Sequence, residues 1–192
     1  MTAIPKSTFL ISPEEYLDGE LVSETRHEYI DGHVYAMAGA SDDHNRIAGN
    51  IFAELRERLR GKRCEPFIND MKVKIPPEIA DAFYYPDVLV SCDPADNQKY
   101  FRERPTVLFE VLSPETERID RKEKALAYWT IPSLKAYVLV EQNRATITLL
   151  RRGENGWKPQ IIDGLAGALP LPEIETEIPL ARIYERTALA SR

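Results

Sequence analysis

The spacing of apolar residues along the chain predicts one long helix and several short buried strands. After Ser41 and two aspartates, apolar side chains recur every four residues before Gly61: Ile47, Ile51, Leu55 and Leu59. This pattern is typical of an amphipathic helix that begins at a serine cap and ends at a glycine. Two apolar runs, 88–90 and 106–112, are short and bounded by Pro, Asp and Asn, which predicts buried strands.

The remaining pattern places a short helix and a hairpin before the long helix, and more strands after it. Ser12, Pro13 and two glutamates predict a helix over 12–18. Asp31-Gly32 between alternating segments predicts a β-hairpin with Glu28 on its first strand. Strands are expected over 63–68, 71–75, 136–141, 145–151 and 157–162, and helical segments over 117–129 and from residue 180.

This order of elements predicts the fold class. It indicates an α/β (α+β) arrangement, with a mixed central β-sheet flanked by helices and an N-terminal β-hairpin. We expect one domain over residues 1–192, with a core over about 12–165 and a C-terminal tail over 166–192.

Composition narrows the function classes. The net charge of −6 argues against a generic polyanion-binding protein, although basic residues gather in 62–74, 99–104 and 118–124 and allow a local basic surface. No run approaches the roughly 20 apolar residues of a membrane helix, and the first ten residues lack the apolar stretch of a secretory signal, so we expect a cytoplasmic location. We predict that Cys64 and Cys92 are small, reduced core residues.

Two carboxylates in the apolar strands are the strongest indication of chemistry. Asp87 stands where the first run begins, and Glu110 stands in the middle of the second. A buried carboxylate is costly unless a cation or several donors compensate it. If the strands are adjacent and antiparallel, both side chains and a backbone carbonyl near Val111 can share Mg²⁺ or Mn²⁺, which suits phosphodiester hydrolysis.

The residues around these acids resemble a known family. The combined pattern resembles the Uma family of restriction-endonuclease-like proteins, in the PD-(D/E)xK nuclease superfamily, over about residues 12–150. The matching residues are Tyr85-Pro86-Asp87-Val88, Leu108-Phe109-Glu110-Val111-Leu112-Ser113-Pro114, Asp120, Lys124, Tyr128, Arg26-His27-Glu28-Tyr29-Ile30-Asp31-Gly32 and His44.

The resemblance implies a restriction-endonuclease-like core in which Asp87 and Glu110 bind the metal, with Glu28 as a further carboxylate and His44 as a further site residue. One position departs from the superfamily pattern, because Leu112 stands where a lysine is usual. The resemblance points to Lys124 as the replacement. A helical wheel instead expects Ile119, Leu126 and Trp129 on the buried side. Lys72 and Lys74 are the alternatives.

Each candidate also has a structural interpretation. Asp87 can cap a strand, Glu28 can lie on a polar strand face, His44 can be a solvated or capping residue, and Lys124 can pair with Asp120 on an exposed face. Ser113 is expected to bond backbone at the end of its strand.

The leading hypothesis is a metal-dependent nuclease that hydrolyses phosphodiester bonds in nucleic acid, with DNA as the expected substrate. We also expect a homodimer, and the apolar segment 178–184 is the candidate contact surface. The alternative is a non-catalytic nucleic-acid- or protein-binding module on a degenerate nuclease fold. A metal-independent hydrolase that uses Ser113 and His44 is a third hypothesis, although no third triad residue is evident.

Overall fold

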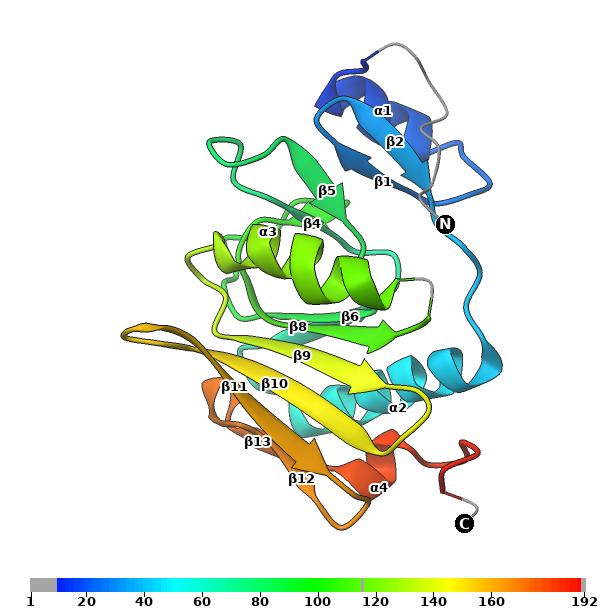
Figure 1. Ribbon diagram of the computed structural model, residues 1–192. Helices are drawn as coiled ribbons and strands as arrows, with labels where there is room; N and C mark the ends of the chain where they lie inside the picture. The colour runs from blue at the N-terminus through cyan, green and yellow to red at the C-terminus, as the bar shows by residue number, and fades with distance from the viewer. Residues whose placement is uncertain (1–9, 115, 191–192) are drawn as a thin grey trace.

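The computed structural model describes residues 10–114 and 116–190 (Figure 1). Its strands form sheets ordered β11-β10-β9-β8-β6-β3, β2-β1-β5-β4-β7 and β12-β13. The helical elements are α1 (Pro13–Glu20), α2 (Asp42–Arg58), the π-helical turn η1 (Ile119–Lys124), α3 (Ala125–Trp129), the 3-10 turn η2 (Pro172–Ile174) and α4 (Leu180–Ile183). The strands are β1 (His27–Ile30), β2 (His33–Ala36), β3 (Glu65–Ile68), β4 (Lys72–Lys74), β5 (Ala82–Tyr84), β6 (Val88–Ser91), β7 (Phe101–Arg102), β8 (Pro105–Leu112), β9 (Ala136–Glu141), β10 (Thr146–Gly153), β11 (Gly156–Asp163), β12 (Ala168–Leu171) and β13 (Thr176–Pro179).

The six-stranded sheet is the centre of the fold, and it is mixed. Strands β8 and β9 run parallel, whereas the other neighbouring pairs of this sheet are antiparallel. The expected antiparallel pairing of the two acid-bearing strands, β6 and β8, is confirmed. The predicted fold class, a mixed sheet flanked by helices with an N-terminal hairpin, is confirmed as well.

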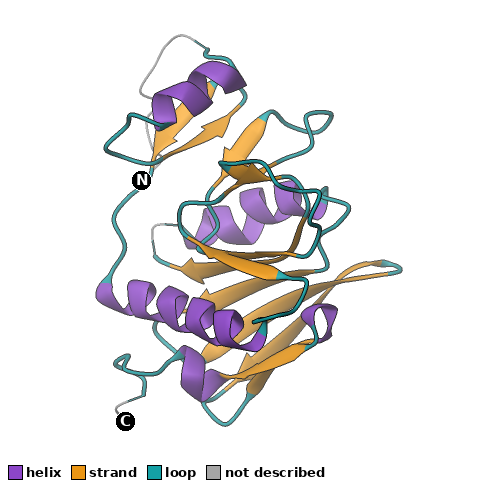
Figure 2. Ribbon diagram, turned by 180° about the vertical axis from the view of Figure 1, so that it is seen from behind, coloured by secondary structure: helices purple, strands orange, loops and turns teal. Residues whose placement is uncertain are grey.

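Alternation along β8 assigns its side chains to two different cores. Val107 and Phe109 pack on the side of α2, whose Ile47 and Ile51 are fully buried there. Leu108 and Leu112 pack on the opposite side, with Ala125 and Tyr128 of α3. Figure 1 shows α3 in front of the sheet, and Figure 2, from behind, shows the long helix α2 across the other face. Glu110 therefore faces η1 and α3, because residues i and i+2 of a strand share a face.

The N-terminal elements form as the sequence predicts. Ser12 and Glu15 make a reciprocal capping box at the start of α1. Asp31 and Gly32 both have positive φ, as the tight turn between β1 and β2 requires. This hairpin extends the five-stranded sheet by pairing β1 with β5, and so brings Glu28 toward the central sheet.

The strands on either side of Asn69-Asp70 enter different sheets. β3 pairs with β6 in the central sheet, and β4 pairs with β5 and β7 in the second. Asn69 adopts a left-handed conformation, φ 59°, and its amide donates to the Asp87 carbonyl at 3.0 Å. The chain therefore crosses between the sheets next to the first candidate acid.

The helix expected over 117–129 differs from the amphipathic helix that the pattern predicts. It begins with the π-helical turn η1, so the 100° wheel does not describe its faces. Leu126, predicted to be buried, is 63% exposed, whereas Asp120 and Lys124 are buried. The predicted buried face is wrong at Leu126, because the ionic partners of Lys124 lie on the inner side.

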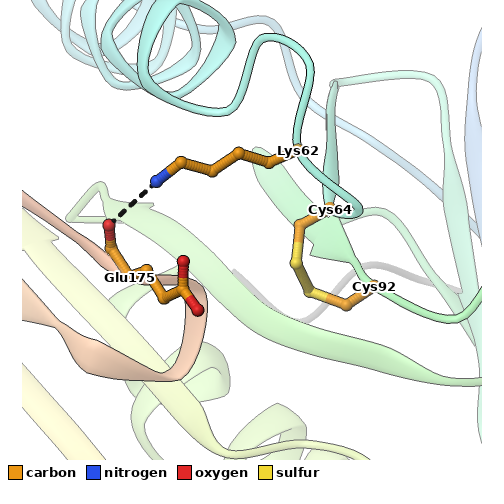
Figure 3. Close-up of a disulfide and its surroundings, with 4 residues drawn as sticks. All are labelled: Lys62, Cys64, Cys92 and Glu175. Atoms are coloured by element: carbon orange, nitrogen blue, oxygen red, sulfur yellow. Dashed lines mark hydrogen bonds between the residues drawn. A yellow bond between two sulfur atoms is a disulfide. The ribbon is translucent and has the colours of Figure 1, made fainter.

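The prediction that both cysteines are reduced is wrong. Cys64 and Cys92 form a disulfide at the end of the β3–β6 pair, with Cα atoms 4.0 Å apart (Figure 3). The register pairs Glu65 with Ser91. Cys64, just before Glu65, therefore lies opposite Cys92, just after Ser91. Because the two cysteines are 28 residues apart in the sequence, local patterns do not predict that they are neighbours. The Lys62 ammonium, also in Figure 3, donates to the Glu175 carbonyl at 3.1 Å.

The C-terminal segment packs on the α2 side of the central sheet. Leu169, Leu171 and Ile178 are fully buried in the same core as α2. Segment 178–184, expected as a contact surface between copies, carries buried apolar side chains at Ile178, Leu180, Ile183 and Tyr184. That expectation is wrong, because this chain's own core covers those side chains. No described helix combines the length and the apolarity needed to cross a membrane.

Candidate active site

Glu110 is buried at the centre of the site. Its residue is 3% exposed, and its Oε1 accepts hydrogen bonds from the Tyr128 hydroxyl at 3.1 Å and the Lys124 ammonium at 3.3 Å. Strand β8 supplies the acid, while both donors come from η1 and α3. The two donors thus offset part of the desolvation cost of the carboxylate.

Lys124 joins carboxylates from three elements. Its Nζ lies 2.9 Å from Glu28 Oε1, 3.3 Å from Glu110 Oε1 and 3.3 Å from Asp120 Oδ1. The four-residue step from Asp120 through Lys124 to Tyr128 directs these side chains to one face, which packs on the sheet. A lysine that follows the strand on a helix therefore occupies the place beside the buried acid.

Glu28 reaches this cluster from the N-terminal hairpin. Besides its contact with Lys124, its Oε1 accepts a hydrogen bond from the Tyr85 amide at 3.3 Å. Tyr84 turns its ring toward the same lysine, with the ammonium 6.0 Å from the ring centroid. The chain just before β6 therefore supports both Glu28 and Lys124.

Asp87 lies at the start of β6 and belongs to the same region. The pairing of Val88 with Phe109, extended by one residue, places Asp87 opposite Glu110. Its Oδ2 accepts a 2.7 Å hydrogen bond from the Val111 amide and lies 3.3 Å from His44 Nε2. His44 comes from the first turn of α2, which Ser41 caps. Both side chains of this pair are 15% exposed, so this part of the site is the more accessible one.

Glu110, Lys124 and His44 have perturbed pKa values. Burial raises the pKa of Glu110 well above its usual value, and the nearby Lys124 charge only partly opposes this. Burial lowers the pKa of Lys124, but the charges of Glu110, Glu28 and Asp120 outweigh it, so its pKa is raised and the ammonium keeps its proton. Burial likewise lowers the pKa of His44, and its hydrogen bond to Asp87 reverses the shift upward. The site contains four carboxylates, Asp87, Glu110, Glu28 and Asp120, beside two bases, Lys124 and His44.

Other candidates lie elsewhere. Lys74 pairs with Glu103 at 3.2 Å, and Lys72 lies between aromatic rings, so neither shares the Glu110 cluster. The Ser113 hydroxyl accepts a hydrogen bond from the Thr116 amide at 3.2 Å, as expected for a residue that ends a strand. Its interactions within the described residues do not include His44, which leaves the triad hypothesis without support.

Two partners in the site were not named as site residues from the sequence: Tyr128, and Asp120, whose expected pair with Lys124 on an exposed face is formed but buried. The Tyr128 hydroxyl and the Asp120 carboxylate complete the surroundings of Lys124, and Asp120 Oδ1 is buried without a hydrogen bond from the described residues. Their spacing from Lys124 by four residues in each direction was the available signal. A regular helical wheel does not place that signal inside, because the turn is a π-helix.

The donor set fits a hard divalent cation only in part. Carboxylate oxygens on adjacent strands and a backbone carbonyl, completed by water, form the kind of set that Mg²⁺ takes. Within the described residues, however, the side chains do not converge as a ready group of three or more His, Cys, Asp or Glu ligands. Asp87 and Glu110 are therefore two carboxylates on adjacent strands, and among the described residues no third carboxylate, His or Cys joins them in a ready ligand group.

The fold is restriction-endonuclease-like. A crystal structure of "a putative nuclease belonging to DUF820" from Anabaena variabilis superposes with a TM-score of 0.72 at 16% identity, covering 91% of this chain and 97% of that one. The chain belongs to the Uma2 family, described as "Putative restriction endonuclease", whose model matches residues 13–181. The resemblance drawn from the sequence is thereby confirmed.

Two uncharacterized proteins from Synechocystis are also similar. One is 37% identical over 147 residues, which cover 76% of this chain and 76% of that protein. The other is 32% identical over 139 residues, which cover 71% of this chain and 77% of that protein. The similarity therefore extends over most of the folded chain.

Proposed function

We propose that this protein is a metal-dependent nuclease that hydrolyses phosphodiester bonds in DNA. Asp87, Glu110 and the backbone carbonyl of Val111 hold Mg²⁺ or Mn²⁺, and Lys124 completes the site. The family supports a nuclease in general. The metal, the DNA substrate and the residue roles are our proposal.

One observation carries this proposal. The superfamily lysine is replaced by Leu112, yet the Lys124 ammonium lies 3.3 Å from the same acid that the usual lysine would accompany. A fold that had merely lost its lysine would have no need to bury another one beside Glu110, since burying an ammonium is costly. The position of Lys124 thus supports a working nuclease site.

Each side chain has a distinct role in the proposed reaction. An ion held by Asp87 and Glu110 would supply Lewis-acid chemistry for phosphodiester hydrolysis. Lys124 donates hydrogen bonds to the attacking water and offsets charge on the phosphate. Glu28 holds the Lys124 ammonium at 2.9 Å. His44 donates to Asp87 and fixes the orientation of that carboxylate.

Purified protein incubated with plasmid, linear and single-stranded DNA, plus Mg²⁺ or Mn²⁺, tests the proposal. We expect cleavage that EDTA abolishes and that Asp87→Asn and Glu110→Gln reduce by at least a hundredfold. Arg46→Gln is the matched control, because Arg46 pairs with Asp42 on the exposed side of the same helix as His44. Equal cleavage by wild type and both acid variants would refute the assignment.

We include a homodimer in the proposal, since two copies suffice to cut both strands of a duplex. Sedimentation velocity of the protein, alone and with a short duplex in Ca²⁺, measures this directly. A complex of two chains per duplex is the expected result. One chain per duplex would contradict it without affecting the proposed chemistry.

A non-catalytic binding module on the same fold is the second candidate. The observation in its favour is that Lys124 is already held by three carboxylates, while the described residues supply no ready three-ligand metal group. Calorimetric titration with Mn²⁺ separates the two. The nuclease shows a site that Glu110→Gln weakens, whereas the module shows no site that depends on Glu110.

A further inference from the structure

Lys72 is a buried cation that the proposed chemistry does not use. It is the first residue of β4 and is only 5% exposed. Its ammonium lies over two tyrosine rings, 5.0 Å from the centroid of Tyr85 and 6.0 Å from that of Tyr16. Tyr16 belongs to α1, and Tyr85 immediately precedes the Pro-Asp pair of the site. Two separate elements therefore hold the ammonium in place.

The described part of the chain supplies this ammonium with no carboxylate within 4.0 Å. Glu20 is near, but it is committed to other donors. Its oxygens accept from the His27 amide at 2.8 Å and the Tyr85 hydroxyl at 3.1 Å, and one lies 3.2 Å from His27 Nδ1. Asp70 is likewise near, and it pairs with Arg26 at 3.1 Å.

Within residues 10–114 and 116–190, the Lys72 ammonium contacts tyrosine rings and has no hydrogen-bond acceptor. Tyrosine rings attract an ammonium through their faces, but they do not replace the acceptors that water provides. Burial lowers the pKa of Lys72, and the charges of Glu20 and Asp70 offset this only in part. A cation held in this state gains most from a partner that brings negative charge and acceptor oxygens together.

Lys72 lies close in the fold to residues of the carboxylate site, and this position indicates which ligand it can bind. The residue whose ring covers the ammonium, Tyr85, donates its amide to Glu28 at 3.3 Å. Three residues before Lys72, the Asn69 amide donates to the Asp87 carbonyl at 3.0 Å. The chain around Lys72 therefore lies next to the segment that carries Tyr85 and Asp87, where the proposed function places a phosphodiester strand. Successive phosphates of such a strand recur at short, regular intervals.

We propose that Lys72 binds a phosphate of the DNA strand adjacent to the phosphate that is cleaved. The inference rests on the proposed function and deepens it by adding a substrate-binding residue outside the metal site. The phosphate supplies the acceptor oxygens that the described residues do not supply. In the protein without DNA, Tyr16 and Tyr85 hold the ammonium in position. Lys72 contributes affinity and register through this contact, and the chemistry stays with the acids and Lys124.

Salt-dependent binding tests the proposal without relying on cleavage. The affinity of full-length protein for a fluorescent duplex is measured in Ca²⁺ at several salt concentrations, for wild type, Lys72→Met, Lys72→Arg and Lys74→Met. Lys74 is the matched control, because it lies two residues along the same strand and already has a carboxylate partner, Glu103. Gels of the same samples verify that the duplex is intact.

Loss of one phosphate contact reduces the slope of log affinity against log salt by about 0.9. For Lys72→Met we therefore expect the drop in affinity between 50 and 200 mM salt to be smaller than that of wild type by a factor of about 3.5. Lys72→Arg and Lys74→Met should retain the wild-type slope. Because Lys72→Met removes an uncompensated buried charge, its melting temperature should equal or exceed that of wild type.

An unchanged slope in folded Lys72→Met overturns the role of Lys72. A lower melting temperature together with an unchanged slope overturns it too, since that pair of results marks a structural cation. Lys72→Gln repeats the measurement if the methionine variant does not fold. If wild type itself shows no DNA binding, the proposed function fails as well, whereas a normal wild-type slope that Lys72→Met leaves unchanged removes only this inference.

Discussion

Replacing Lys124 by methionine tests the ionic centre of the site. Methionine keeps most of the apolar stem but removes the charge that contacts Glu28, Glu110 and Asp120. At an effective dielectric constant of about 20, two unit charges about 3 Å apart interact by roughly 5–6 kcal/mol. The cost of desolvating the ammonium opposes this attraction. Removing one partner of a buried ion pair typically costs about 3–5 kcal/mol, which is the loss of unfolding free energy that we expect at pH 8.

The loss should depend on pH in a defined direction. Without the ammonium, the pKa of buried Glu110 rises further, because the Lys124 charge that partly opposed the effect of burial is gone. A carboxyl group whose pKa is raised by folding stabilises the protein below its unfolded pKa, and this contribution is lost as pH rises through the folded pKa. The deficit of Lys124→Met relative to wild type should therefore be smaller at pH 5 than at pH 8.

Urea denaturation, followed by the fluorescence of the stacked pair Trp129 and Trp157, measures these values. The double variant Lys124→Met/Glu110→Gln should recover about 1–2 kcal/mol, because it removes one of the stranded charges. Arg46→Met, at an exposed pair, serves as the control. A deficit below about 1 kcal/mol for Lys124→Met, equal at both pH values, would refute the buried ionic centre.

Three further results are expected. Reducing the Cys64–Cys92 bridge, which closes a loop of 28 residues, should lower the unfolding free energy by about 3–4 kcal/mol in urea titrations, and Cys64→Ser/Cys92→Ser should reproduce this without reductant. In an NMR titration, the pKa of His44 should lie above 6.5 and should fall in Asp87→Asn; the stabilisation from protonated His44 is full below pH 6.5 and is lost as pH rises through the raised pKa. Tyr128→Phe removes a donor to the buried glutamate and should cost about 1.5–3 kcal/mol by the same urea assay.

The sequence predicts the parts of the fold in which local signals agree with burial. The serine cap and the four-residue repeat define α2, since Ile47, Ile51 and Leu55 face the sheet with no competing demand. The short apolar runs define β6 and β8 for the same reason. Asp87 and Glu110 could be singled out because Asp87 directly precedes one such run and Glu110 interrupts the other with a charge.

The remaining features depend on partners far away in the chain. Whether Lys124 faces inward is decided by Glu28 and Glu110, which local periodicity does not contain, and by a π-helical turn that changes the angle per residue. The pairing of Cys64 with Cys92 follows from the register of β3 against β6, which only the folded sheet reveals. Local patterns therefore indicate elements, while ionic and covalent pairs require the topology.

A crystal of the protein soaked in Mn²⁺ gives the most direct test of the central claim. We predict an anomalous peak between the carboxylates of Asp87 and Glu110, with the Lys124 ammonium beside it, and no such peak in Glu110→Gln. An intact, well-diffracting crystal with Mn²⁺ bound elsewhere and no peak between these carboxylates would contradict the account.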